Sequence, residues 1–205
     1  MGLGAAWHEP EFAAYGWPFP PVAQRMEMLE EAVQIVDRML TQRPASFTGK
    51  HYTIQHAYND PMPVQQPRPP IMIGGSGEKM TLRLVAQYAD FCNVFGDPAT
   101  VAHKFAVLRD HCARVGRPYD AITRSNHVSI LIARDDTELA AKQQRFGDRL
   151  RNFDGLIGTP DTIIAGLKAY AAVGSQYVTF TMPDVDDIAP IALLGDLVVP
   201  AVAQV

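Results

Sequence analysis

The sequence predicts an α/β fold built on a parallel sheet. Short apolar segments typical of buried strands alternate with amphipathic helical segments along most of the 205 residues. The links are short, and repeated strand–helix alternation favours parallel strands joined by right-handed crossovers. Five strand–helix units can be counted, whereas a closed (β/α)8 barrel needs eight units and ~250 residues. Because the chain opens abruptly at Gly2-Leu3-Gly4, as if at the end of a strand, we expect a partial (β/α)8 barrel with roughly the first three units absent.

The expected elements follow in order along one domain, residues 1–205. The clearest helix covers residues 22–40, where Met26, Leu29 and Val33 begin an apolar stripe flanked by acidic side chains. A β-hairpin is predicted over residues 46–54, followed by a stiff, proline-rich connector at 61–70. Further strands are expected at 71–73, 91–95, 122–132 and 177–181, and further helices at 78–88, 97–115, 135–149, 159–173 and 188–199. Residues 135–138 are expected to cap the helix that they begin, and residues 11–16 are expected to form an ordered loop.

A glycine-rich turn, Gly74-Gly75-Ser76-Gly77, joins the expected strand at 71–73 to a helix. Glycines let the backbone come close to a ligand, and the first N–H groups of a helix lack internal partners, so they can point at a phosphate. Glu78 would lie in the first helical turn, where the helix dipole favours a carboxylate. From this local pattern alone, a phosphate site and a simple tight turn remain equally open.

Composition narrows the function classes. The net charge is −4 and no basic run occurs, so nucleic acid is not an expected partner. No apolar segment reaches the ~20 residues of a membrane-spanning helix, and the N-terminus lacks the pattern of a signal peptide. Cys92 and Cys112 form neither a CxxC motif nor a disulfide framework. We therefore expect a cytoplasmic protein.

Several motifs, in a fixed order, resemble one known family. The segment Gly2-Leu3-Gly4-Ala5-Ala6-Trp7 resembles the "GxGxGW" stretch of the bacterial luciferase-like superfamily, and especially its branch of F420-dependent oxidoreductases. Each motif is weak alone, but the ordered set is fairly specific and covers nearly the whole chain. The other matching positions are Glu11, Tyr15-Gly16, Pro20, Arg25, residues 47–52 and 69–77, Tyr88-Ala89-Asp90, Asn93 and Gly158-Thr159-Pro160.

The resemblance implies a TIM barrel, of which this sequence is similar to the part from the end of the fourth strand to the C-terminus. It implies hydride transfer between a small organic substrate and C5 of the cofactor F420, with the protein positioning and shielding the cofactor. Ala5 departs from the sugar-phosphate dehydrogenases of the family, which carry a glutamate there. The implied cofactor-binding residues are Leu3, Gly4, His8, Gly74, Gly75, Ser76 and Gly77.

Two alternative functions remain open at this stage. An FMN-dependent luciferase-like monooxygenase would use the same glycine turn, because either cofactor carries a phosphate. A truncated, non-catalytic relative would bind a phosphate ligand or a partner chain instead. Open strand edges of an incomplete barrel also favour pairing of chains, so we expect a homo-oligomer.

No residue is identified as catalytic from the sequence. His8 is a weak candidate because imidazole suits proton transfer near neutral pH, but a surface loop histidine is an equally good interpretation. Glu11 is interpreted as a buried partner of Arg25, and Asp90 as a cap for backbone groups. Asn93, near the C-terminal end of its strand, could face the pocket.

The remaining polar clusters are interpreted as structural or inert. Arg124, Ser125, Asn126 and His127 enter the strand at 122–132 from its N-terminal end, where barrels do not place active sites. No metal site is expected, because the helix that carries His103, His111 and Cys112 offers neither i,i+4 ligand spacing nor a carboxylate to complete a ligand shell.

Overall fold

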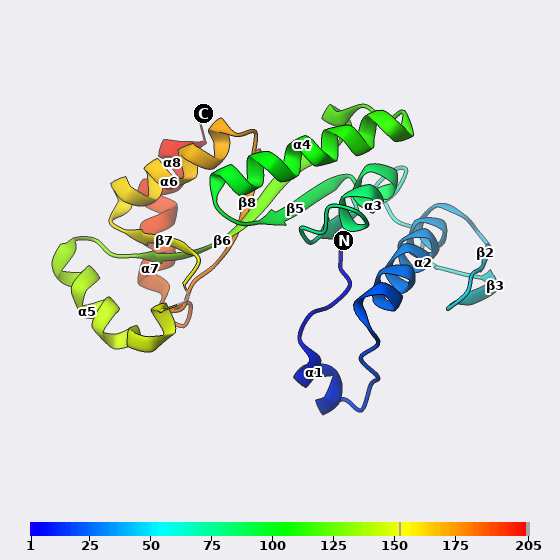
Figure 1. Cartoon of the computed structure of the whole chain (residues 1–205), viewed down its shortest axis with the longest axis horizontal. Coiled ribbons are helices and arrows are strands. Elements are labelled where there is room, and N and C mark those ends of the chain that lie inside the picture. The colour runs from blue at the N-terminus through cyan, green and yellow to red at the C-terminus, as the bar shows by residue number, and fades with distance from the viewer. Residues whose placement is uncertain (152, 204–205) are drawn as a thin grey trace. The chain divides into compact units, whose positions relative to one another are not determined.

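The computed structural model describes residues 1–151 and 153–203. These residues form two compact units, one of Met1–Cys92 with Val107–Ile122 and one of Asn93–Ala106 with residues 123–151 and 153–203. Strand β5 (Phe91–Phe95) and helix α4 (Pro98–Val115) contribute residues to both units (Figure 1). Each unit contains parallel strand pairs and helices, which confirms the α/β class.

The first unit is built on β1 (Gly2–Leu3) and β4 (Met72–Gly74), which pair in parallel with Leu3 opposite Ile73. The N-terminus therefore does form the end of a strand, as expected. Helix α3 (Thr81–Tyr88) follows β4 and buries Leu82 and Val85 completely, together with Ile71 and Ile73 of the strand region. These apolar side chains form the core that holds the strand–turn–helix segment in place.

Helix α2 (Val22–Thr41) contacts the hairpin of β2 (Ala45–Thr48) and β3 (Thr53–Ala57), and both elements confirm their predictions. In Figure 1 the hairpin lies beside the C-terminal part of α2. Met26, Leu29 and Val33 are buried along the predicted apolar stripe. The Glu31 carboxylate of α2 accepts hydrogen bonds from the backbone N–H groups of Lys50, His51 and Tyr52, at 2.7–2.9 Å. The helix thus holds the hairpin turn through one side chain.

The second unit is organised around the long strand β6 (Thr123–Ile132). Strand β8 (Tyr177–Thr181) pairs in parallel with its first half, and β7 (Gly155–Gly158) pairs in parallel with its second half. β7 is not among the predicted strands, because four residues with a glycine at each end carry little strand signal. The helices of this unit are α5 (Asp136–Phe146), α6 (Pro160–Ala172), α7 (Ile188–Leu193) and α8 (Val199–Val202).

Several element boundaries differ from expectation. The helix expected at 188–199 is divided by a π-helical turn, η3 (Leu194–Val198), and a short helix, α1 (Glu9–Ala14), forms where a loop was expected. Helix α3 begins at Thr81 rather than at Glu78, and no side chain caps it. In contrast, Asp135 caps α5 as predicted by accepting a hydrogen bond from the N–H of Glu138. Two 3-10 turns, η1 (Tyr119–Ala121) and η2 (Gly147–Leu150), complete the described elements.

Within the described part of the chain, no helix is long and apolar enough to cross a membrane. Over the same residues, His, Cys, Asp and Glu side chains do not gather in threes in a way that could hold a metal ion.

Candidate functional site

The glycine turn lies at the C-terminal end of β4 and remains accessible. Gly74, Gly75 and Ser76 are half-buried and Gly77 is exposed, so solvent reaches this loop. Gly75 has a φ of +130°, a backbone conformation that side chains rarely adopt, and a glycine is needed there. Since β1 and β4 run in parallel, their C-terminal ends adjoin, and the turn lies next to Leu3 and Gly4. The structure therefore brings the two predicted backbone segments together.

The turn also packs tightly against the first residue of α3. A Cβ atom on Gly77 would lie 2.8 Å from the hydroxyl oxygen of Thr81, and one on Gly75 would lie 3.2 Å from the methyl carbon of Thr81. Thr81 is 7% exposed, and its hydroxyl points to the sulfur of Met26 at 3.9 Å. Packing against Thr81 is therefore a structural reason for glycine at positions 75 and 77, independent of any ligand, because a side chain there would come too close to Thr81.

The loop after β1 is held by Arg25, and one interpretation of it was wrong. The guanidinium of Arg25 donates hydrogen bonds to the carbonyl oxygens of Ala5, Ala6 and Pro20, at 2.5–2.9 Å. Glu11 is exposed, so it is not the buried partner expected for Arg25. Three backbone carbonyls serve as the acceptors of this cation instead, and these hydrogen bonds fix the course of the loop.

His8 lies farther along the same loop, at the N-terminal boundary of α1. Its side chain is exposed, and its ring centroid lies 4.9 Å from that of Trp7, which is itself 84% exposed. Two exposed rings on a loop offer a surface that a flat ligand could contact. His8 remains a candidate cofactor contact on these grounds.

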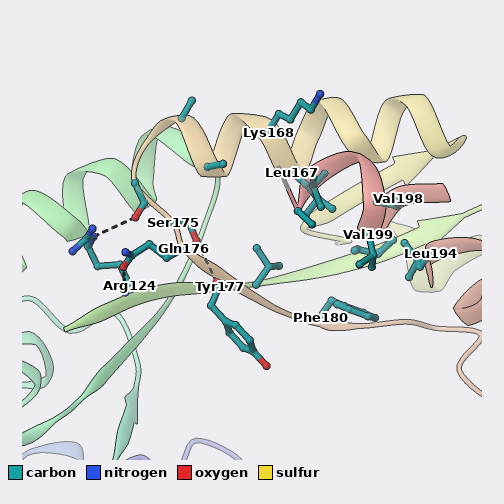
Figure 2. Close-up of a pocket in the computed structure, with 17 residues that line it drawn as sticks. Arg124, Leu167, Lys168, Ser175, Gln176, Tyr177, Phe180, Leu194, Val198 and Val199 are labelled. Atoms are coloured by element: carbon teal, nitrogen blue, oxygen red, sulfur yellow. Dashed lines mark hydrogen bonds between the residues drawn. The ribbon is translucent and has the colours of Figure 1, made fainter. Parts of the chain in front are cut away.

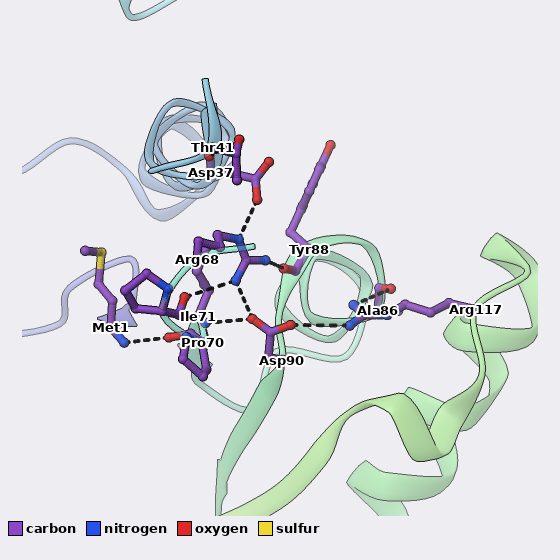
Figure 3. Close-up of polar contacts among 11 residues, drawn as sticks. Met1, Asp37, Thr41, Arg68, Pro70, Ile71, Ala86, Tyr88, Asp90 and Arg117 are labelled. Atoms are coloured by element: carbon purple, nitrogen blue, oxygen red, sulfur yellow. Dashed lines mark hydrogen bonds and ion pairs between the residues drawn. The ribbon is translucent and has the colours of Figure 1, made fainter. Parts of the chain in front are cut away.

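An ion-pair cluster missed by the sequence interpretation anchors the start of β4. Arg68, whose side chain is 11% exposed, donates to the carboxylates of Asp37 at 2.6 Å and Asp90 at 2.5 Å (Figure 3). Asp90 also accepts a hydrogen bond from the backbone N–H of Ile71 at 2.8 Å, which confirms its predicted capping role. Burial acts to lower the pKa of Arg68, but the hydrogen bonds to both carboxylates outweigh it and raise the pKa above its ordinary value. The cluster joins α2, the connector and the strand that leads to the glycine turn.

For the polar residues of the second unit, the structure confirms some of the predicted roles and positions and differs from others. Arg124 donates to the carbonyl of Gly174 at 3.2 Å, and Asn126, which is fully buried, accepts a 2.6 Å hydrogen bond from the hydroxyl of Ser175. These contacts bear out a structural role for both. Asn93 bonds to the hydroxyls of Ser125 and Thr179. His127, in contrast, lies in the middle of β6 with its side chain half-buried rather than at the entrance to the strand.

A cavity of about 780 Å³ lies in the second unit between β6 and β8 on one side and α6, η3 and α8 on the other. Figure 2 shows Leu167, Leu194, Val198 and Val199 gathered along it, with Phe180 on the strand side and Tyr177 directed away from the helices. The residues that line it include none of the predicted cofactor contacts. Its walls are mainly aliphatic, so we assign it no chemistry.

Comparisons with known proteins place the chain in a family. Residues 1–155 match the family model of the luciferase-like monooxygenases. The chain is similar to the structure of an F420-dependent secondary alcohol dehydrogenase in complex with an F420–acetone adduct, with 18% identity and a TM-score of 0.81, over 98% of this chain and 69% of that one. It is also similar to the coenzyme F420-dependent tetrahydromethanopterin reductase from Methanopyrus kandleri, with 19% identity and a TM-score of 0.75, over 97% and 73% of the two chains.

A third solved structure, that of a monooxygenase, matches with a TM-score between these two values. A monooxygenase from Streptomyces bottropensis has 16% identity and a TM-score of 0.76, over 98% of this chain and 68% of that one. At these identities the similarity shows the fold alone, and the chain corresponds to part of the luciferase-like barrel. Because the family model covers more than half of the sequence and its motifs occur in order, this chain belongs to the luciferase-like monooxygenase family.

Proposed function

We propose that this protein is an F420-dependent oxidoreductase that transfers a hydride between F420 and a small organic substrate. The observation that carries the proposal is the accessible glycine turn at the C-terminal end of β4, next to the end of β1, in a chain of this family. Two of the similar structures are F420-dependent enzymes. C-terminal strand ends are where parallel barrels place their active sites.

The residues present fit a phosphate-bearing cofactor. Gly4 and Gly74 carry no side chains that would cover the strand ends, and the backbone of Gly74, Gly75, Ser76 and Gly77 is at least partly exposed. The backbone N–H groups of this turn would bind the ribityl-phosphate portion. Leu3, Gly4 and His8 would contact the ring or its side chain. When bound, the cofactor would supply the hydride chemistry, while the protein binds it, orients it and excludes water.

A charge substitution in the turn tests this site. Ser76→Asp adds a negative charge beside the proposed phosphate and is expected to weaken F420 binding by about tenfold or more. The side chain introduced by Ser76→Asn has nearly the same size as that of Ser76→Asp but no charge. This variant should therefore bind F420 with an affinity close to that of the wild type. Fluorescence titration of both variants measures the dissociation constants. Equal affinities for the Asp and Asn variants would contradict the phosphate role of the turn.

Gly75→Asp should abolish cofactor binding as well, but it also replaces a glycine at a positive φ. Its effect therefore combines charge with backbone strain. Gly75→Asn has the same strain and nearly the same size as Gly75→Asp but no charge, so only the additional loss in Gly75→Asp reports on the phosphate.

An FMN-dependent monooxygenase is the second candidate, supported by the similarity to the Streptomyces bottropensis monooxygenase. Both cofactors would use the same turn for their phosphate. Parallel titrations with F420 and FMN separate the two, because an F420 enzyme should bind F420 the more tightly. A protein that binds neither would fit the third candidate, a non-catalytic relative that binds a phosphate ligand or a partner chain.

A further inference from the structure

One face of the second unit carries a row of hydroxyl, amide and imidazole groups. Side chains alternate along β6, so Ser125, His127 and Ser129 share a face, while Asn126, Val128 and Ile130 share the opposite, buried one. The register of β8 places Thr179 opposite His127 and Thr181 opposite Ser129. The two strands thus form a polar face with a histidine at its centre, and Ser125 at one end of this face is buried.

The hydrogen bonds of His127 leave one of its ring nitrogens able to bind a further group. Its Nδ1 lies 3.1 Å from the hydroxyl oxygen of Thr179, and its Nε2 lies 3.5 Å from that of Thr181. The second distance is at the long limit for a hydrogen bond, and Thr181 is exposed. The Thr181 hydroxyl also lies 3.3 Å from that of Ser129, so the network continues to a second hydroxyl. A ligand oxygen could bind Nε2 and the Thr181 hydroxyl together at this exposed part of the network.

Either tautomer of the neutral imidazole is compatible with this network. If Nδ1 carries the proton, it donates to Thr179, whose own hydroxyl can donate to the carbonyl of Asn126 at 3.5 Å, and Nε2 is an acceptor. If the Thr179 hydroxyl rotates to donate to Nδ1, then Nε2 carries the proton and is a donor. When Nε2 is an acceptor, it can receive a hydrogen bond from the O–H of an alcohol. When Nε2 is a donor, it can donate to the oxygen of a carbonyl compound.

The surroundings favour an uncharged ligand with an apolar body. Side chains in contact with the ring include two threonines and Phe95, whose ring centroid lies 5.7 Å away and which is 47% exposed. Burial lowers the pKa of His127, so the imidazole is neutral at pH 7 and offers no charge to an anion. Phe95 provides an apolar wall beside the polar atoms.

We propose that His127 and Thr181 bind the oxygen atom of a neutral alcohol or carbonyl compound, with Phe95 against its hydrocarbon part. This inference rests on the proposed function, because alcohol and carbonyl are the two ends of a hydride-transfer reaction, and it names the substrate class. It also replaces the structural interpretation of His127 with a binding role.

The test uses the full chain labelled with ¹⁵N-histidine and NMR of the imidazole nitrogens. Cyclohexanol and cyclohexanone are titrated as neutral probes, and cyclohexanecarboxylate is titrated as the anionic one. The neutral probes should shift the His127 signals to saturation, and the carboxylate should bind at least tenfold more weakly. Signals of the other histidines should not follow the titration, and His127→Phe identifies the signals of His127.

Thr181→Val provides the matched variant, because it removes the hydroxyl with almost no change of shape. It should weaken the binding of the neutral probes about fivefold, the effect of one lost hydrogen bond. Thr137→Val, at an exposed helical position of the same unit, should leave binding unchanged.

Two results with the neutral probes would overturn the inference: no saturable shift in the wild type, or wild-type affinity in Thr181→Val. Tighter binding of the carboxylate would do so too. The F420 and FMN titrations at the glycine turn have a separate readout. A chain that shows the His127 shifts but binds neither cofactor would keep the alcohol or carbonyl site and lose the redox function.

Discussion

Arg68 illustrates what a single side chain does for the candidate site. It lies in a proline-rich segment where the sequence indicates only a stiff connector. Its guanidinium nevertheless joins Asp37 of α2 to Asp90, and Asp90 in turn holds the N–H of Ile71 just before β4. The planar fork of N–H donors fixes the directions in which the two carboxylates are bound, whereas the three donors of an ammonium rotate freely.

Arg68→Met is expected to lower the free energy of unfolding by about 2 kcal/mol. The substitution removes the cation and leaves two partly buried carboxylates near each other without it. Chemical denaturation monitored by circular dichroism measures the change. Arg68→Lys keeps the charge but loses the fork, so its loss should be intermediate; a variant as stable as the wild type would contradict the anchoring role.

At the scale of elements, the β2–β3 hairpin depends on a helix distant in sequence. Glu31 of α2 accepts three backbone N–H groups from the turn, and a Cβ on Gly49 would lie 2.4 Å from the carboxylate. The glycine is needed because the carboxylate comes so close. The hairpin itself follows from its sequence pattern, but its attachment to α2 does not.

This attachment should make the hairpin sensitive to acid. Burial acts to raise the pKa of Glu31, yet the three N–H groups outweigh it and lower the pKa below its ordinary value of 4.5. A carboxyl with a lowered pKa in the folded state stabilises the fold above its unfolded pKa, and this stabilisation is lost as the pH falls through the folded pKa.

Glu31→Gln is expected to lower the thermal midpoint at pH 7 and to flatten its decline below pH 4.5. Thermal unfolding at a series of pH values between 7 and 3 (about 0.5 apart) measures both effects, with Glu9→Gln, at an exposed position of α1, as the control. If the variant and the wild type decline in parallel, the turn does not depend on the ionised carboxylate.

At the scale of the whole molecule, the exposed strand β8 bears on assembly. Within the second unit β8 pairs with β6, and its Tyr177 and Phe180 are 52% and 46% exposed. Strand edges and aromatic side chains left open to solvent favour pairing with another chain.

We therefore expect a homo-oligomer in solution. Light scattering coupled to size exclusion should give a mass at least twice the 22.5 kDa of one chain. Phe180→Lys should shift the protein toward the monomer, because a charge at this position disfavours edge pairing. A monodisperse monomer at all concentrations would contradict this expectation.

The local sequence pattern was sufficient to predict a structural feature where that feature depends on residues close together in the chain. The amphipathic stripe of α2, the hairpin, Asp135 as the cap of α5 and the strand–glycine–helix order at residues 71–88 all follow from spacing and residue type, because these features depend on neighbours in the chain. Predictions were wrong where the local signal is weak. The strand β7 is only four residues long. Residues 78–80 were expected in helix α3 but lie before it, and there the N–H of Leu82 donates to the carbonyl of Gly77.

The sequence by itself determined the α/β class, the order of its elements, the family and the glycine turn. Tertiary structure alone decided that Arg25 serves carbonyls rather than Glu11, that Arg68 joins two carboxylates, and that His127 meets Thr179 and Thr181. Periodicity along a chain encodes which face of a segment is buried. The partner of a polar group is set by strand register and by contacts between residues 19 to 54 positions apart, and no local pattern carries that information.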